Sequence, residues 1–263
     1  MNRRTLIIVT TGVALIAFGC ITTFVIFPVN VESLDREFEP HTADEFEVTG
    51  AFPTGSERYV EYKGAVDANG TAYFHKRSSE GSGYVSERYE DDMAIYIRIE
   101  TNRTETYFAD REQRLYGGDI IEQKEQGDRV VTIIYANESD RTVEESIRTQ
   151  GQIINRVLGQ AAYNNVEDTN TNTVIVPKNG WYSHKDISAN YRITEAAGKI
   201  QIDPESDTVL RADVEFERTI GGSHLAYLLN RDNAFQIELV YDVETGPTTV
   251  DTPGWVDEIR SSE

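Results

Sequence analysis

The pattern of hydrophobic and polar residues divides the chain into an uncharged N-terminal run and a long series of alternating segments. Residues 5–27 contain no charged side chain. At a rise of about 1.5 Å per residue, a helix of this length covers roughly 34 Å, enough to cross a hydrocarbon core of about 30 Å. The pattern therefore predicts a transmembrane helix over residues 5–27.

Charges on either side of this run predict its orientation. Arg3 and Arg4 precede it, and Glu32, Asp35 and Glu37 follow it. Because positive residues stay on the cytoplasmic side, residues 1–4 are expected in the cytoplasm and the rest of the chain outside the cell. We therefore expect a single-pass protein of the cell membrane, with the lipid bilayer as the partner of residues 5–27.

Two other processing routes remain open for this segment. The tetrapeptide that ends at Cys20 loosely resembles a lipobox, in which Cys20 would be lipidated and become the N-terminus. The apolar residues that follow Cys20 instead favour a small apolar residue inside a spanning helix. Ordinary cleavage is the other route, but no Ala-x-Ala pattern closes the run. We expect an uncleaved signal anchor.

Beyond the anchor, the pattern changes to a polar segment and then to a β-rich domain. Residues 28–55 are acidic and contain three prolines, which predicts a tether. Residues 56–263 are expected to form the extracellular domain, in which turn residues separate short alternating runs in the manner of an antiparallel meander. The expected strands are 58–63, 71–76, 84–89, 93–100, 104–108, 113–116, 129–135, 173–176, 199–203, 209–216 and 235–243.

One helix is expected at 143–158. Thr142 and Glu145 form a capping-box pattern before it, and Gly159 is placed to follow its C-terminus. Apolar residues return at helical spacing at Ile147, Ile154, Val157 and Leu158. Since this stripe is narrow, the helix is expected to lie against a sheet. Residues 164–172 are interpreted as a loop.

About ten strands in one domain predict a curled antiparallel sheet or an open barrel. The fold class is therefore mainly β with one or two helices (α+β), and the helix would cover the concave face. Such an arrangement can enclose an apolar cavity. Its candidate lining residues are Ile147, Ile154, Leu158, Trp181 and Trp255. The alternative is that these side chains simply fill the core.

A family resemblance supports this arrangement. The residues that carry it are Gly198 to Asp203, the return strand from Asp207 to Leu210, the strand 235–243, and the closing Thr248 to Trp255. Their order resembles that of the lipoprotein-carrier families LolA and LppX/LprG, and of uncharacterised haloarchaeal membrane-anchored lipoprotein-like families. The resemblance implies a half-barrel that holds acyl chains or another apolar ligand. The chain departs from these carriers in its anchor, and a permanently anchored protein would not shuttle.

Composition changes this picture in two respects. The net charge is −20, and lysine is scarce among the 25 basic residues. Acidic surfaces keep proteins soluble at high salt, where repulsion is screened, so we expect a halophilic archaeal source. The same charge argues against nucleic-acid binding, because no basic stripe is present to displace counterions from phosphates.

Cysteine and asparagine usage fit an extracellular domain. The one cysteine is Cys20, so the domain has no disulfide, thiolate metal site or cysteine nucleophile. Three sequons, at Asn69, Asn102 and Asn137, fall beside expected turns or strand ends. They predict surface glycosylation.

The chain shows little sign of catalytic chemistry. The histidines His41, His75, His184 and His224 are scattered, without the spacing of metal ligands. The acidic run Glu90 to Asp92 could bind calcium, but such a run in this composition is more typical of a solvated loop. No nucleotide-binding or nucleophile motif is present, so we expect no catalytic residues, no metal and no cofactor.

The leading hypothesis from these patterns is a non-enzymatic, membrane-anchored surface protein that binds a lipid or another apolar ligand. An alternative is a structural or interaction module of the cell envelope, with envelope proteins as partners and no cavity. A hydrolase is the third and least favoured hypothesis, since no constellation of catalytic residues supports it.

Overall fold

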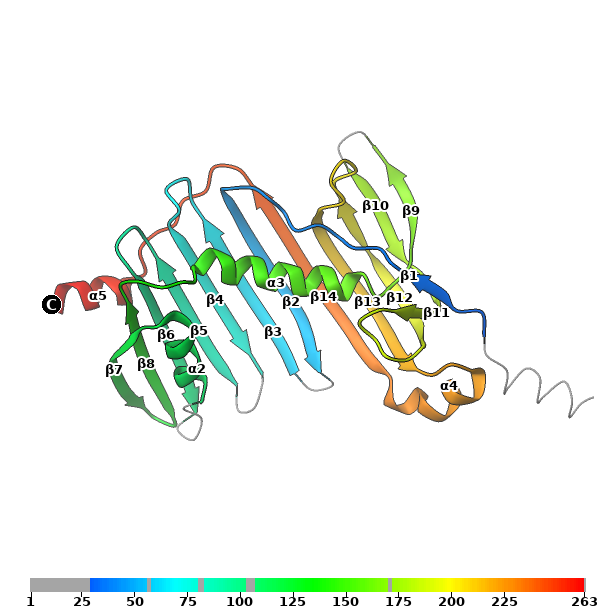
Figure 1. Cartoon of the computed structure of the whole chain (residues 1–263), viewed down its shortest axis with the longest axis horizontal. Coiled ribbons are helices and arrows are strands. Elements are labelled where there is room, and N and C mark those ends of the chain that lie inside the picture. Colours follow the sequence, from blue (N-terminus) through cyan, green and yellow to red (C-terminus); the bar gives the residue numbers. More distant parts are fainter. Residues whose placement is uncertain (1–28, 56–57, 80–82, 103–106, 170–171, 263) are drawn as a thin grey trace, which may run out of the picture.

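The computed structural model describes residues 29–55, 58–79, 83–102, 107–169 and 172–262, which form an open sheet of 14 strands with helices packed on it (Figure 1). This confirms the mainly β fold class. The strands are β1 (Glu32–Leu34), β2 (Phe46–Gly55), β3 (Arg58–Val66), β4 (Ala72–Ser78), β5 (Tyr84–Glu90), β6 (Ile95–Asn102), β7 (Asp119–Gln126), β8 (Arg129–Ala136), β9 (Tyr163–Asp168), β10 (Thr173–Pro177), β11 (Gly180–His184), β12 (Tyr191–Ile202), β13 (Val209–Ile220) and β14 (Phe235–Thr245). The helices are α2 (Tyr107–Tyr116), α3 (Val143–Leu158), α4 (His224–Asn230) and α5 (Gly254–Ser262), with a 3-10 turn at Arg231–Asn233.

The strand order is that of a meander joined to the C-terminal strands. It runs β1-β11-β12-β13-β14-β2-β3-β4-β5-β6-β8-β7, and β10 and β9 branch from β12. The pair β1–β11 is parallel, and the other described pairs are antiparallel. Strand β14 pairs with β2, which brings the last long strand beside the first one. The domain is therefore one continuous sheet.

The sheet begins earlier than the sequence pattern indicated. Residues 46–55, assigned above to the tether, form β2 between β14 and β3. Phe46, Val48 and Phe52 alternate along this strand and are buried. Pro53 suggested a break in the pattern, but it lies near the strand end, where the register with β3 shifts and a missing N–H costs little.

Other elements also differ from the expectation. Residues 107–116 form α2, because Phe108, Glu112 and Tyr116 recur at helical spacing and are buried. The helix replaces the strand expected at 113–116 and the end of the one expected at 104–108, whose residues 104–106 lie outside the described residues. Strand β9 occupies part of the expected loop at 164–172. Helices α4 and α5 had no counterpart in the prediction. Gly159 follows the C-terminus of α3 as predicted, and with a φ of −58° it does not adopt the left-handed conformation typical of a glycine after a helix.

Helix α3 has the predicted bounds and the predicted N-terminus. Thr142 Oγ1 accepts a hydrogen bond from Glu145 N at 3.0 Å, and Glu145 Oε2 accepts one from Thr142 N at 3.3 Å, which completes the capping box. The helix crosses one face of the sheet and contacts β2, β3, β4 and β5 (Figure 1). We call this the helix face, and the other side of the sheet the open face.

A glycine lets α3 approach the sheet closely. A Cβ atom built on Gly64 would lie 2.8 to 2.9 Å from three side-chain carbons of Ile147. Ile147, Ile154 and Leu158 are all buried against the sheet. Burying an aliphatic side chain of this size is worth about 1.5–3 kcal/mol, so this stripe fixes the helix on the sheet.

The open face is covered at one end by α5. Val256 and Ile259 of this helix pack with Tyr89, Tyr96 and Ile133 in a second, smaller core. Elsewhere the outward positions of the strands carry mainly charged and polar side chains. Within the described ranges, no helix is long and apolar enough to cross a membrane; residues 5–27 lie outside these ranges.

Candidate functional site

The three aliphatic residues proposed to line a cavity lie together beneath α3. Ile147, Ile154 and Leu158 belong to the main core and are at most 1 % exposed. They contact the sheet directly, so the space between α3 and the strands below is filled by protein. These residues stabilise the fold, and a site for a ligand has to be sought elsewhere.

The two tryptophans lie at opposite ends of the sheet. Trp181 is on β11, where its ring meets those of His224 and Tyr227 edge-on at 5.5 and 6.0 Å. Trp255 lies in the first turn of α5 and packs against the second core on the open face. The two rings therefore do not line one cavity.

Of the positions proposed for modification, Asn69 and Asn137 are exposed and Asn102 is half-buried. Asn69 lies in the turn between β3 and β4 and Asn137 follows β8, and both are exposed. Asn102 ends β6, but the rest of its sequon lies outside the described residues. Cys20 also lies outside them. Use of the sequons and lipidation of Cys20 remain predictions.

The acidic run considered for calcium is used by the fold. Glu90 Oε2 accepts a hydrogen bond from Val143 N at 2.5 Å, at the start of α3. Asp91 Oδ2 lies 2.5 Å from Arg260 Nη2 of α5, and Asp91 Oδ1 accepts from Met93 N at 3.0 Å. Across the part of the chain that is described, no group of three His, Cys, Asp or Glu side chains is arranged to hold a metal ion.

A pocket of about 370 Å³ lies beside the C-terminal end of α3, and we call it the Arg218 pocket. It opens between this helix end, the loop after β11, and strands β2, β13 and β14. Its apolar lining comes from Pro53, Val157, Ile187, Phe235 and Ile237. Its polar lining comes from Gln160, Asp186 and Arg218. The volume lies at the lower end of the range of small-molecule sites, which is about 300–1,000 Å³.

Arg218 is the distinctive residue of this pocket. Its Nη1 donates a hydrogen bond to the side-chain Oε1 of Gln160, and its guanidinium lies 5.3 Å from the ring centroid of Phe235. No carboxylate among the described residues forms an ion pair with it. Burial lowers the pKa of Arg218, as expected for a partly desolvated cation with neutral partners. The pocket therefore offers a positive charge that a bound anion can complement.

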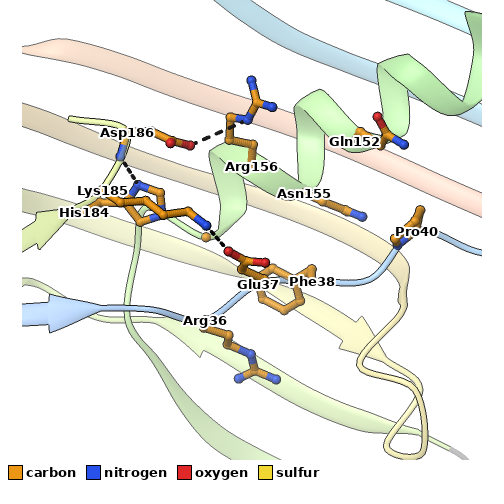
Figure 2. A pocket seen from close by; sticks show the side chains of 11 residues that line it. Arg36, Glu37, Phe38, Pro40, Gln152, Asn155, Arg156, His184, Lys185 and Asp186 are labelled. Atoms are coloured by element: carbon orange, nitrogen blue, oxygen red, sulfur yellow. Dashed lines mark hydrogen bonds and ion pairs between the residues drawn. The ribbon is translucent and has the colours of Figure 1, made fainter.

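A second cleft, of about 270 Å³, lies on the other side of the same helix end (Figure 2). We call it the Arg36 cleft. It is formed by residues 36–40, α3 and the loop after β11, and Asp186 borders both this cleft and the Arg218 pocket. Asn155 faces it with a buried Oδ1 that has no hydrogen-bond partner among the described residues.

The cations of the Arg36 cleft already have carboxylate partners. Arg36 Nη2 lies 2.7 Å from Asp207 Oδ1, and Arg156 Nε lies 3.6 Å from Asp186 Oδ2. Figure 2 shows the ammonium group of Lys185 directed at the carboxylate of Glu37, with which it forms an ion pair. An anion entering this cleft would have to displace these pairs, so the Arg218 pocket is the better anion site.

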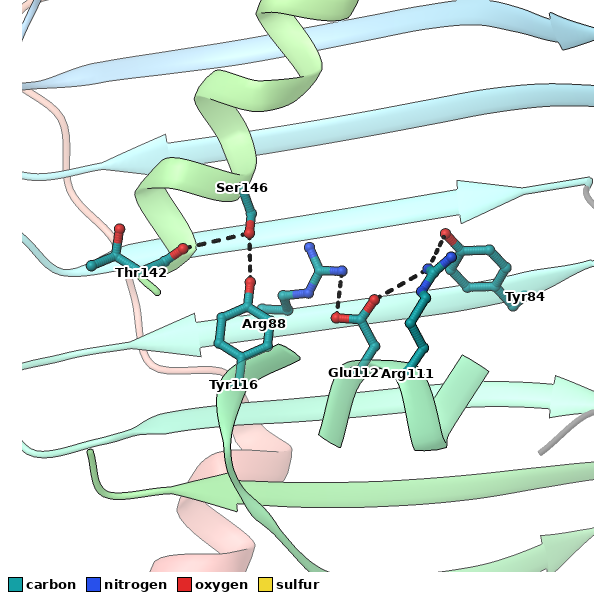
Figure 3. Close-up of polar contacts among 7 residues, drawn as sticks. All are labelled: Tyr84, Arg88, Arg111, Glu112, Tyr116, Thr142 and Ser146. Carbon is teal, nitrogen blue, oxygen red and sulfur yellow. Dashed lines mark hydrogen bonds and ion pairs between the residues drawn. The ribbon is translucent and has the colours of Figure 1, made fainter. Parts of the chain in front are cut away.

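A third polar cluster is structural (Figure 3). Arg88 of β5 pairs with Glu112 of α2 beneath that helix, and Tyr116 Oη lies 2.5 Å from Ser146 Oγ of α3. Arg88 also lies over the rings of Phe74 and Tyr116, at 5.0 and 5.7 Å. Burial acts to lower the pKa of Arg88, but Glu112, Tyr116 and Tyr84 outweigh it, so the net shift is upward and the cation is retained. The cluster holds α2, α3 and the sheet together.

Sequence reasoning missed the Arg218 pocket. Arg218 lies two residues before the end of an alternating strand. A charged residue at such a position is ordinarily interpreted as exposed to solvent. Alternation with the buried Val214 and Phe216 places Arg218 on the helix face. The register that sets it opposite Phe235 of β14 is not contained in the sequence pattern of either strand.

Comparison of the chain with protein-family models, with curated proteins and with solved structures finds no match. The site is therefore interpreted from its own geometry.

Proposed function

We propose that this chain is a non-enzymatic, membrane-anchored surface protein that binds a small amphiphilic anion in the Arg218 pocket. The ligand has a carboxylate or phosphate head and an apolar body. The observation that carries this proposal is the partly buried guanidinium of Arg218, which has neutral partners and stands beside an apolar wall.

Both parts of the ligand follow from the lining. A charge-assisted hydrogen bond to a partly desolvated arginine is worth about 1.5–3 kcal/mol, which favours an anionic head. Phe235 and Val157, which are both half-buried, provide the surface against which an apolar body would lose contact with water. Because the pocket is small and open, it accommodates a short chain or one end of a longer one.

The architecture is compatible with the resemblance to LolA-like carriers, which remains part of the proposal. The resemblance implies a half-barrel sheet with helices packed in its mouth, and the structure has an open sheet with α3 across one face. In the carrier arrangement a ligand lies between helix and sheet; here α3 is packed directly on the strands, and the proposed ligand lies beside the helix end. The membrane anchor at residues 5–27 and the extracellular position of the domain also remain proposals.

The direct test is mass spectrometry of the protein purified from its source membrane under native conditions, followed by extraction of bound small molecules. We expect an acidic amphiphile at close to one molecule per chain. Protein that consistently carries no such molecule, even after incubation with lipids extracted from that membrane, would contradict the proposal.

An interaction module of the cell envelope is the second candidate. The observation that favours it is the open face, where Glu61 and Glu238 are exposed on β3 and β14, and neighbouring strands form charged pairs such as Arg98–Glu87. A photo-crosslinker placed at either glutamate in intact cells should then give one defined adduct. The same label at Asn69, in a turn, serves as the control.

A further inference from the structure

Helix α4 presents an unpartnered apolar surface. Leu225, Leu228 and Leu229 are 39, 52 and 72 % exposed, and Ile220 at the end of β13 is 44 % exposed. The three leucines have the spacing i, i+3 and i+4, so they share one side of the helix. We call these four residues the α4 patch. A contiguous apolar surface of this kind is typical of an interaction site.

The chain is locally uncharged at this patch. From Thr219 to Asn230 there is no Asp, Glu, Lys or Arg, in a protein that contains 45 acidic residues. Acidic side chains on the surface of the domain would repel an anionic lipid surface. Their absence over this run therefore distinguishes the patch from the rest of the domain.

An aromatic and cationic group stands directly behind the patch. The guanidinium of Arg192 lies 4.4 Å from the ring centroid of Tyr227 and 5.5 Å from that of Trp181. Trp181 and Tyr227 in turn meet edge-on. Tryptophan and tyrosine are enriched at membrane–water interfaces, because each ring combines an apolar body with a polar group.

The patch lies at the end of the sheet where the expected anchor enters the domain. Strand β1 pairs with β11, with Glu32 opposite Tyr182, the neighbour of Trp181 (Figure 1). Trp181 contacts His224 and Tyr227 of α4. Even fully extended, the chain from Phe27 to Glu32 spans at most about 17 Å. A chain anchored by residues 5–27 would therefore leave the bilayer close to α4.

We infer that the α4 patch docks on the outer surface of the bilayer that holds the anchor. This inference rests on the anchor of the proposed function and adds a second membrane contact that fixes the orientation of the domain. The area favours a lipid surface over a second copy of the chain. Four partly exposed side chains offer a few hundred Å² at most, against about 800 Å² per partner in a stable protein interface. Lipid binding needs less, since the anchor already holds the patch at the membrane.

The test uses the full chain reconstituted into phosphatidylcholine–phosphatidylglycerol vesicles whose acyl chains are brominated or not. Bromine quenches tryptophan emission only at short range, and the chain has two tryptophans. Trp255→Phe leaves Trp181 as the reporter at α4, and Trp181→Phe leaves Trp255 as the reporter at the opposite end. We expect brominated lipid to lower Trp181 emission about two-fold and to leave Trp255 emission unchanged.

Replacing Leu225, Leu228 and Leu229 with serine should abolish the quenching of Trp181. The matched control is Val240→Ser, which removes an exposed apolar side chain from β14 on the open face. Near-ultraviolet circular dichroism checks that each variant is folded. If the triple variant does not fold, Leu229→Glu alone, at the most exposed position, should reduce the quenching.

The outcomes separate this inference from the proposal beneath it. Flotation of the vesicles on a density gradient shows whether the protein is bound to them. Protein that floats with the vesicles but shows no quenching of Trp181 would contradict docking by α4 and would still support the membrane anchor. Protein that does not float would overturn both. Equal quenching of Trp181 in the wild type and in a folded triple or Leu229→Glu variant would assign the lipid contact to another surface and overturn docking by α4.

Discussion

Arg88 Nη2 lies 2.8 Å from Glu112 Oε2, in an ion pair whose side chains are 6 and 2 % exposed. The pair joins β5 to α2 (Figure 3), and the rings of Phe74 and Tyr116, with centroids 5.0 and 5.7 Å from the Arg88 guanidinium, help to exclude water from it. Two charges so far from solvent are favourable only together, because each alone would carry an uncompensated desolvation cost. The pair therefore makes α2 and the sheet depend on each other.

Removing one member of this pair should destabilise the domain strongly. Glu112→Gln leaves the Arg88 cation buried without its counter-charge, and we expect a loss of about 3–5 kcal/mol in the free energy of unfolding. Denaturant unfolding measures this loss. The control is Arg129→Gln, which breaks the more exposed pair with Glu100 and should cost less than about 1 kcal/mol. Similar losses in the two variants would show that Arg88–Glu112 is not desolvated.

The contact between Gly64 and Ile147 predicts an over-packing effect. Gly64→Ala places a methyl group where Ile147 atoms stand 2.8 to 2.9 Å away, and should destabilise the domain by about 1–3 kcal/mol. Ile147→Val removes one of these atoms and should recover part of the loss in the double variant, a coupling that a double-mutant cycle measures.

The control for this pair is Gly254→Ala, where no atom lies within 4 Å of the added methyl group. A Gly64→Ala protein as stable as the wild type would indicate room beneath α3. That result would reopen the space between helix and sheet as a ligand cavity.

The features that the sequence predicted correctly are those in which local chemistry and periodicity agree. Thr142 and Glu145 marked the start of α3, and the stripe from Ile147 to Leu158 gave its length and its buried side. The clearest alternation, at 93–100, corresponds to β6. In each case the residues that form the element also stabilise it locally, so no distant partner is needed to recognise it.

The features that were missed depend on distant partners. Strand β2 is recognisable as a strand once β14 and β3 flank it, because its Pro53 and Gly50 weaken the local pattern. Helix α2 is stabilised through Glu112 by an arginine on β5. The Arg218 pocket combines residues of β2, α3, β13 and β14, and periodicity along one segment does not show which residues of another segment it will meet.

Buried His41 predicts a pH dependence of stability. Burial, followed by the nearby charge of Arg148, lowers the pKa of His41 to about 4. Between pH 6.5 and pH 4 the unfolded chain therefore binds a proton that the folded chain excludes. His41 therefore lowers the free energy of unfolding by about 3 kcal/mol as the pH drops from 6.5 to 4. Above pH 6.5 it adds no further pH dependence.

His41→Leu should remove this part of the pH dependence. The substitution costs no hydrogen bond at Nδ1, since that atom has no partner among the described residues. Unfolding free energies are measured from pH 4 to pH 8; between pH 6.5 and pH 4 the wild type should lose about 3 kcal/mol relative to the variant. Parallel curves would show that His41 is protonated in the folded protein, against the expectation.

Arg218 allows the sharpest test of the proposed ligand chemistry. With dodecanoate as the probe, Arg218→Gln should weaken binding about 10- to 100-fold, because the anion loses one charge-assisted hydrogen bond worth about 1.5–3 kcal/mol. Arg218→Lys should retain part of the affinity, since it keeps the charge but loses the planar guanidinium over Phe235. Isothermal titration calorimetry measures each dissociation constant. The matched control is Arg211→Gln, which removes an exposed arginine from the same strand and should leave binding unchanged. If dodecanoate bound the wild type but Arg218→Gln and Arg211→Gln weakened it equally, its attraction would be one of general charge, and the pocket would not be the site.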